Sequence, residues 1–167
     1  NHKNPKNRKT IKTEKTVKAI KAETDFPVIL FPGDYSQITE TADALLFLSL
    51  LSGRNPEYLI EQQVKSVEKL KNSKLEIIPT AYILIEGGKE CAVQRVSCTK
   101  PIPQSEVTSV VNTALAGQFL GKNLIYLEAG SGADFPVSEE IITEVNKAIN
   151  IPLIVGGGIR SLEQQKK

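Results

Sequence analysis

Residues 124–133 read LIYLEAGSGA, and residues 151–161 read IPLIVGGGIRS. In each stretch an apolar run is followed directly by a glycine cluster, which indicates a buried strand and then a loop whose backbone N–H groups can approach a ligand closely. Loops of this kind, at the carboxyl ends of strands and in front of helices, bind phosphate readily. Two of them in neighbouring strand–loop–helix units predict a site for a phosphorylated small molecule.

The rest of the sequence alternates predicted strands with amphipathic helices, which is typical of parallel βα units. Further strands are expected at residues 26–31, 44–51 and 75–85, with residues 92–96 returning as a hairpin arm. A helix is expected at residues 13–24, with Val17 and Ile20 facing inward. A second is expected after Asn55-Pro56-Glu57, with an apolar stripe of Ile60, Val64, Val67 and Leu70. Three more are expected from a Ser105 cap to about Gly121, from Ser138, and from a capping box at residues 161–164.

A complete (β/α)8 barrel uses roughly 250 residues, whereas this sequence has 167 residues and begins and ends within the pattern. We therefore expect an α/β fold, a modified (β/α)8 TIM-like barrel that is incompletely represented here. Residues 1–167 are expected to form a single domain, with residues 1–12 as a flexible basic segment. An open doubly wound sheet is the alternative.

Composition excludes several classes of function. No apolar stretch reaches the ~20 residues of a transmembrane helix, so no transmembrane segment is expected. His2 is the only histidine, which argues against histidine-based triads and histidine metal sites in these residues. Cys91 and Cys98 are too far apart for a C-x-x-C motif and flank a predicted strand. Reduced thiols are therefore expected, which favours a cytoplasmic protein.

The basic residues gather at the start of the chain. Residues 1–21 hold eight of the 21 basic residues and one of the 19 acidic residues. A basic arm on an acidic body can bind nucleic acid. However, a lysine at every third position drifts around a helix, and no aromatic residue is interleaved for base stacking. A solvated surface segment is therefore favoured, with no nucleic-acid partner.

Five sequence motifs match those of a known family: FPG (31–33), ADALLFLSLLS (42–52), RNPEYLI (54–60), YLEAGSGA (126–133) and VGGGIRS (155–161). They resemble the geranylgeranylglyceryl phosphate synthase family, including its heptaprenylglyceryl phosphate synthase relatives, from about Thr13 onward. That family is a modified (β/α)8 barrel that forms the first ether bond of a lipid backbone. The resemblance implies a prenyltransferase, with magnesium (Mg2+) as cofactor, and a homo-oligomer. It also implies sn-glycerol 1-phosphate and a polyprenyl diphosphate as substrates, with geranylgeranyl diphosphate expected.

Two side chains are candidates for catalysis. Glu128, at the end of a predicted strand, is placed like a general base for the glycerol hydroxyl. The alternative is that its carboxylate only accepts hydrogen bonds from nearby loop amides. Tyr82 matches a tyrosine that the family places in its site, and the alternative is a half-buried barrel tyrosine.

The resemblance places the substrate phosphate on the two glycine clusters. The amides of Gly130, Ser131, Gly132, Gly156, Gly157 and Gly158 are expected to bind it, with Tyr126, Leu127, Glu128 and Ala129 completing the substrate site. The second cluster could instead be only a tight turn. Arg160 is expected either to contact the phosphate or to pair with a carboxylate and so hold the loop, and we favour the loop-holding role. Residues 44–51 line a polyprenyl channel or belong to the core, and core is favoured.

The sequence departs from the family in its metal motifs. An L-I-D-P-D-K-like strand and a G-G-S-like strand end carry much of the family's magnesium and diphosphate binding, and neither occurs before Thr13. Asp25, Asp34 and Asp43 do not match them, so no metal ligand is assigned. A polypeptide lacking those strands would be an inactive remnant. Two other functions stay open: another phosphate-binding barrel enzyme, and a non-catalytic binding protein with a basic tail.

Overall fold

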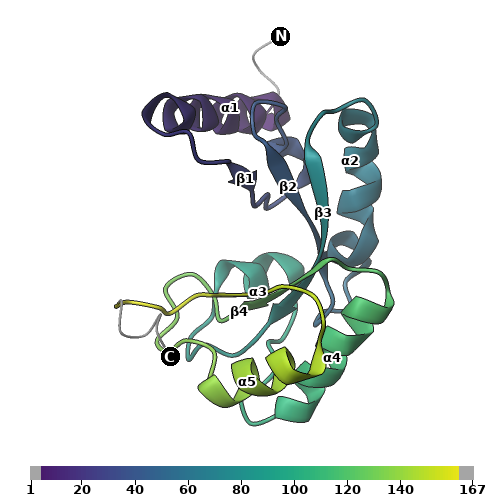
Figure 1. Ribbon diagram of the computed structural model, residues 1–167, viewed down its shortest axis with the longest axis vertical. Coiled ribbons are helices and arrows are strands. Elements are labelled where there is room, and N and C mark those ends of the chain that lie inside the picture. The colour runs from purple at the N-terminus through teal and green to yellow at the C-terminus, as the bar shows by residue number, and fades with distance from the viewer. Residues whose placement is uncertain (1–4, 162–167) are drawn as a thin grey trace. The chain divides into compact units, whose positions relative to one another are not determined.

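The computed structural model describes residues 5–161, and in this range strands alternate with helices as expected (Figure 1). Five strands form one sheet whose order follows the chain, β1-β2-β3-β4-β5. The pairs β1–β2, β3–β4 and β4–β5 are parallel. The strands are β1 (Ile29–Leu30), β2 (Ala44–Leu50), β3 (Glu76–Leu84), β4 (Leu124–Glu128) and β5 (Leu153–Gly156). The prediction of parallel βα units is confirmed.

Helices connect these strands. The α-helices are α1 (Pro5–Glu23), α2 (Gln62–Leu70), α3 (Ala92–Ser97), α4 (Val107–Phe119) and α5 (Glu139–Ala148). A short 3-10 helix, η1, covers Tyr35–Gln37, and a π-helical turn, η2, covers Glu57–Glu61 directly before α2. None of the helices in the described range is long and apolar enough to cross a membrane.

The chain divides into two compact units, and unit 1 comprises residues 1–47 and 60–78. Its described core includes Val17 of α1 and Leu45 of β2. Lysines of α1 are paired with acidic side chains: Lys9 Nζ lies 2.6 Å from Asp34 Oδ2, and Lys21 Nζ lies 2.6 Å from Asp43 Oδ1. These pairs favour a surface helix over a free basic arm.

Two expectations about unit 1 are wrong. Ile20 of α1 is exposed rather than inward. The predicted apolar stripe beyond Asn55 is also mostly exposed, with 54% of Ile60, 58% of Val64 and 48% of Val67 accessible. The buried face of α2 consists of Gln63, Ser66 and Leu70. Apart from Leu70, the apolar residues of this segment therefore do not mark the buried face of the helix.

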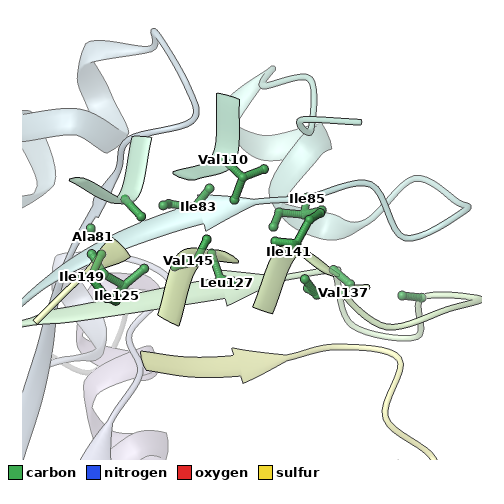
Figure 2. Close-up of a cluster of buried hydrophobic side chains, with 13 residues drawn as sticks. Ala81, Ile83, Ile85, Val110, Ile125, Leu127, Val137, Ile141, Val145 and Ile149 are labelled. Carbon is green, nitrogen blue, oxygen red and sulfur yellow. The ribbon is translucent and has the colours of Figure 1, made fainter. Parts of the chain in front are cut away.

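Unit 2 comprises residues 48–59 and 79–167, and its core lies between the sheet and two helices. Figure 2 shows this cluster, whose labelled side chains come mainly from β3, β4, α4 and α5. Successive strand residues point to opposite faces of a sheet. Ile125 and Leu127 of β4 enter this core, whereas Tyr126 packs into a second cluster with Tyr82. The alternation therefore gathers the candidate site residues on one face.

The segment after β3 is a helix, so the predicted hairpin arm at residues 92–96 is wrong. Cys91 caps helix α3, because its side chain accepts a hydrogen bond from the backbone of Gln94, while the Gln94 side chain accepts one from Cys91 N at 2.8 Å. A segment of five residues with three apolar ones does not distinguish helix from strand by its pattern. The two thiols flank this helix instead of a strand, and both are free, Cys91 buried and Cys98 exposed.

One of the predicted helix caps is confirmed and another is wrong. Ser138 caps α5 as expected, because Ser138 Oγ accepts a hydrogen bond from Ile141 N at 3.3 Å. Ser105 does not cap α4, whose N-cap is Glu106 without a side-chain hydrogen bond. The capping box at residues 161–164 falls mostly outside the described residues. Helix α1 begins at Pro5 rather than Thr13. The flexible segment at residues 1–12 and the single domain stay predictions.

Candidate functional site

Tyr82, Tyr126 and Glu128 lie on the face of the unit 2 sheet opposite the main core. In the parallel register of β3 and β4, Tyr82 is the partner of Tyr126 and Leu84 is the partner of Glu128. The rings of Tyr82 and Tyr126 have centroids 5.6 Å apart and planes tilted by 53°. Register and alternation thus bring two hydroxyls and one carboxylate to the carboxyl ends of neighbouring strands.

Both tyrosines stay protonated in this environment. Burial raises the pKa of Tyr82 far above its usual range, and the nearby charge of Glu128 adds to this. Burial also raises the pKa of Tyr126, helped by the charge of Glu128 and by the hydrogen bond between the two side chains. The Tyr126 hydroxyl therefore donates to the Glu128 carboxylate, and Tyr82 presents a neutral, buried hydroxyl and ring beside it.

Glu128 is at once a loop-amide acceptor and a strengthened base. Its Oε1 accepts a hydrogen bond from Gly130 N at 2.7 Å. Burial raises the pKa of Glu128, and the hydrogen bonds from Gly130 N and the Tyr126 hydroxyl only partly oppose this. A fixed carboxylate with a raised pKa suits proton abstraction. The loop-amide interaction is therefore present, and it orients the group that would act as base.

The first glycine loop follows Glu128 directly. Gly130 and Gly132 have φ angles of 105° and 75°, which other residues rarely adopt. Ala133 N donates to Gly130 O at 3.1 Å and closes the turn. The Gly130 amide was expected to bind the phosphate, but it donates its hydrogen bond to Glu128 instead. The exposed amides of Ser131 and Gly132 have no hydrogen-bond partner among residues 5–161 and remain the donors of this loop.

The second glycine loop packs against the same carboxylate. A Cβ added to Gly157 would lie 2.6 Å from Glu128 Oε1, and one added to Gly156 would lie 2.3 Å from Tyr126 Oη. Gly157 and Gly158 have φ angles of 84° and 71°. These glycines thus serve a close approach between the two loops in addition to a turn, and the predicted convergence of the two clusters is found.

A third loop, which follows β3, packs against the first glycine loop. Gly87 and Gly88 follow β3, and Gly87 O accepts a hydrogen bond from Asp134 N at 2.7 Å. A Cβ on Gly87 would lie 2.2 Å from Ala129 O. The signal was available, since this glycine pair also stands directly behind an apolar run.

Two side chains hold these loops together. Gln104 Nε2 donates to Glu86 O at 2.8 Å and to Pro136 O at 2.9 Å, and Gln104 Oε1 accepts from Ser138 N at 2.7 Å. Arg160 Nη2 donates to Ala133 O at 2.9 Å, so it holds the loop through a backbone carbonyl rather than through the expected carboxylate. Gln104 was missed because a lone glutamine carries no signal in sequence.

The other predicted residues contribute differently. Leu127 and Ala129 have side chains buried in the main core, so they anchor β4 and do not face the tyrosines. In residues 44–51, Leu45 and Leu50 are buried, in line with the favoured core interpretation.

Known proteins match this chain in sequence and in fold. The PcrB family matches residues 7–167. A geranylgeranylglyceryl phosphate synthase of Zunongwangia profunda is 66% identical over 145 residues, which are 87% of this chain and 62% of that protein. One of Pyrococcus furiosus is 50% identical over 141 residues, which are 84% of this chain and 55% of that protein.

A solved structure agrees with these matches. (S)-3-O-geranylgeranylglyceryl phosphate synthase of Thermoplasma acidophilum, in complex with its substrate sn-glycerol-1-phosphate, superimposes with a TM-score of 0.86 at 42% identity. The match covers 92% of this chain and 61% of that chain. This chain therefore spans about three fifths of the length of these relatives. The match over residues 7–167, joined to a shared barrel fold, shows that the chain belongs to the PcrB family.

Proposed function

We propose that the full-length protein is a prenyltransferase that joins a polyprenyl diphosphate, geranylgeranyl diphosphate being the expected one, to sn-glycerol 1-phosphate. The observation that carries this proposal is the placement of the Glu128 carboxylate between two glycine loops, within hydrogen-bond reach of the first and in contact with the second. The printed names of the relatives, and the substrate bound in the Thermoplasma acidophilum structure, support it.

In the proposed reaction each group of the site has one role. The phosphate binds to the amides of Ser131 and Gly132, with the backbone of residues 157–158 opposite, and the glycerol hydroxyl points to Glu128. Glu128 takes the hydroxyl proton as the oxygen bonds to the terminal carbon of the prenyl chain. The bond from that carbon to the diphosphate breaks, and the diphosphate leaves with its electron pair. Tyr126 fixes the carboxylate, and Tyr82 packs against Tyr126.

Magnesium belongs to this proposal only through the family resemblance. In the part of the chain that the structure describes, no three His, Cys, Asp or Glu side chains lie close enough together to hold a metal ion. Asp34 and Asp43 are instead hydrogen-bonded to lysines of α1. No residue of this part is therefore assigned as a ligand, and no step is derived through the ion.

Two further features complete the proposal. A homo-oligomer is supported by the resemblance alone. A cytoplasmic location is supported by the two free thiols, since reduced cysteines are typical of that compartment.

The direct test is the formation of the ether product. Full-length protein is incubated with geranylgeranyl diphosphate, Mg2+ and either sn-glycerol 1-phosphate or its 3-phosphate enantiomer, and the lipid extract is analysed by mass spectrometry. The proposal expects a prenyl glyceryl ether phosphate from the 1-phosphate and much less from the enantiomer. Absence of any ether product with chains of several prenyl lengths would refute it.

A further inference from the structure

A lysine from the third loop lies over the first glycine loop. Lys89 follows Gly87 and Gly88 at the end of β3. A Cβ built on Gly132 would lie 3.8 Å from both Cε and Nζ of Lys89, and no other atom of the described chain, apart from the residues next to Gly132, comes within 4 Å of it. The space beside Gly132, where a side chain would stand, is thus open except for the end of the Lys89 side chain.

The backbone holds Lys89 at this place. Gly87 O accepts hydrogen bonds from Asp134 N at 2.7 Å and from Phe135 N at 3.5 Å, so the loop that carries Lys89 is fastened to the loop that carries Gly132. Both glycines flanking this contact, Gly88 and Gly132, have positive φ angles. The position of Lys89 relative to the Gly132 amide is therefore set by the fold of unit 2.

The ammonium itself is only loosely held. Lys89 Nζ lies 3.6 Å from Asp134 Oδ1, and both side chains are about half exposed, at 53% and 55%. An exposed pair at this distance is weak. Lys89 can therefore exchange Asp134 for another anion with little cost, and Asp134 keeps the ammonium close to the loop.

We propose that Lys89 donates a charge-assisted hydrogen bond to the substrate phosphate bound at the Ser131 and Gly132 amides. This inference rests on the proposed function and adds a binding residue that the glycine clusters alone do not reveal. The Ser131 and Gly132 amides and the half-exposed Lys89 ammonium near Gly132 are donors that one phosphate can use together, and hydrogen bonds to an ionised acceptor are the stronger kind. Asp134, with the same charge sign as the phosphate, competes for Lys89.

The test measures binding of two ligands, sn-glycerol 1-phosphate and inorganic phosphate, to full-length protein by isothermal titration. Lys89→Gln should weaken both by about 10-fold, as expected for loss of a charged donor. Lys89→Arg, which keeps the charge, should stay within about threefold of the wild type. Asp134→Asn should bind at least as tightly as the wild type, because it removes the competing carboxylate.

A matched control and a kinetic split complete the design. Lys147→Gln removes another exposed lysine of unit 2, one that is paired with Glu144 at 2.7 Å, and should leave both affinities unchanged. In turnover assays Lys89→Gln should raise KM for glycerol 1-phosphate with kcat unchanged, because the contact is made equally in the ground and transition states.

The outcomes separate this inference from the proposed function. Wild-type binding and turnover together with unchanged affinity in Lys89→Gln would overturn the role of Lys89 alone. Phosphate binding that depends on Lys89, without any ether product, would support the contact and refute the prenyltransferase. If the wild-type protein binds neither ligand, both proposals are wrong.

Discussion

At the scale of single residues, the behaviour of Glu128 follows from burial opposed by two hydrogen bonds. Burial raises its pKa, while Gly130 N and the Tyr126 hydroxyl stabilise the charged form and hold the carboxylate in one orientation. The carboxylate is thereby a stronger base than an exposed glutamate, and it is already aimed when substrate arrives. Burial raises the basicity, and the two hydrogen bonds both orient the carboxylate and partly lower its pKa, so loss of one hydrogen bond changes the pKa in a defined direction.

Replacing Glu128 with Gln should remove the base and spare the fold. A general base typically contributes about 10²–10⁴-fold, so turnover should fall by that factor while phosphate affinity changes little. A raised carboxyl pKa in the folded state means that stability is lost as pH rises above 4.5, the usual value for Glu. The neutral amide escapes this loss, so the melting temperature at pH 7 should not decrease. Turnover above a tenth of wild type would exclude Glu128 as the base.

Tyr126→Phe should change the pH dependence in a defined direction. The Tyr126 hydrogen bond lowers the pKa of Glu128, so its loss should raise that pKa further. Since the base must be ionised, kcat/KM falls as pH decreases through this pKa. The acid limb of the kcat/KM profile should therefore lie above pH 4.5 in the wild type and move to higher pH in the variant. A limb that stays in place would show that this hydrogen bond does not tune the base.

At the scale of elements, the loops that follow β3, β4 and β5 pack closely against one another, and their glycines serve two purposes, close approach and a positive φ. Gly156 and Gly157 allow close approach to Tyr126 and Glu128, whereas Gly132 supplies a positive φ beside open space.

Gly121 offers the matched control for Gly132. It has a φ of 79°, close to the 75° of Gly132, and nothing lies within 4 Å of a Cβ built on it. Alanine at either position should cost about 1 kcal/mol of folding stability through backbone strain. Only Gly132→Ala should also weaken sn-glycerol 1-phosphate binding in isothermal titration. Equal affinity in the two variants would show that the first loop serves the fold alone.

Elements with a strong local signal were predictable from sequence, and packing decided the rest. The strands ending at Glu128 and Gly156 and the cap at Ser138 were expected because apolar runs, glycine clusters and a capping serine act locally. The buried face of α2 was not predictable, since Gln63 and Ser66 are buried there while the apolar Val64 and Val67 are exposed. Gln104 and Lys89 were missed because their roles arise only when distant loops meet.

At the scale of the whole molecule, the chain forms two compact units, and the candidate site lies entirely within unit 2. Its residues come from β3, β4 and β5 and the loops that follow them. The main core of unit 2 lies on the other face of the same strands, so the stability of the site depends on packing that faces away from it.

Substitution of Ile125 by smaller residues tests how much this core contributes to the stability of unit 2. Ile125 is fully buried in the core, next in sequence to Tyr126. Ile125→Val should cost about 0.5–1.5 kcal/mol and Ile125→Ala about 2–5 kcal/mol of unfolding free energy, measured by urea denaturation of the full-length protein. Costs below ~0.5 kcal/mol for both would contradict the assignment of this cluster as the core of unit 2.

The central claim is that Glu128 and the glycine loops form a site for sn-glycerol 1-phosphate, and its affinity for the two enantiomers tests that claim most directly. Isothermal titration of full-length protein should show saturable 1:1 binding of the 1-phosphate. The 3-phosphate should bind at least several-fold more weakly, because a phosphate held on the loops directs only one enantiomer's hydroxyl to the carboxylate. Equal affinity for both enantiomers, or no binding of either, would contradict the claim.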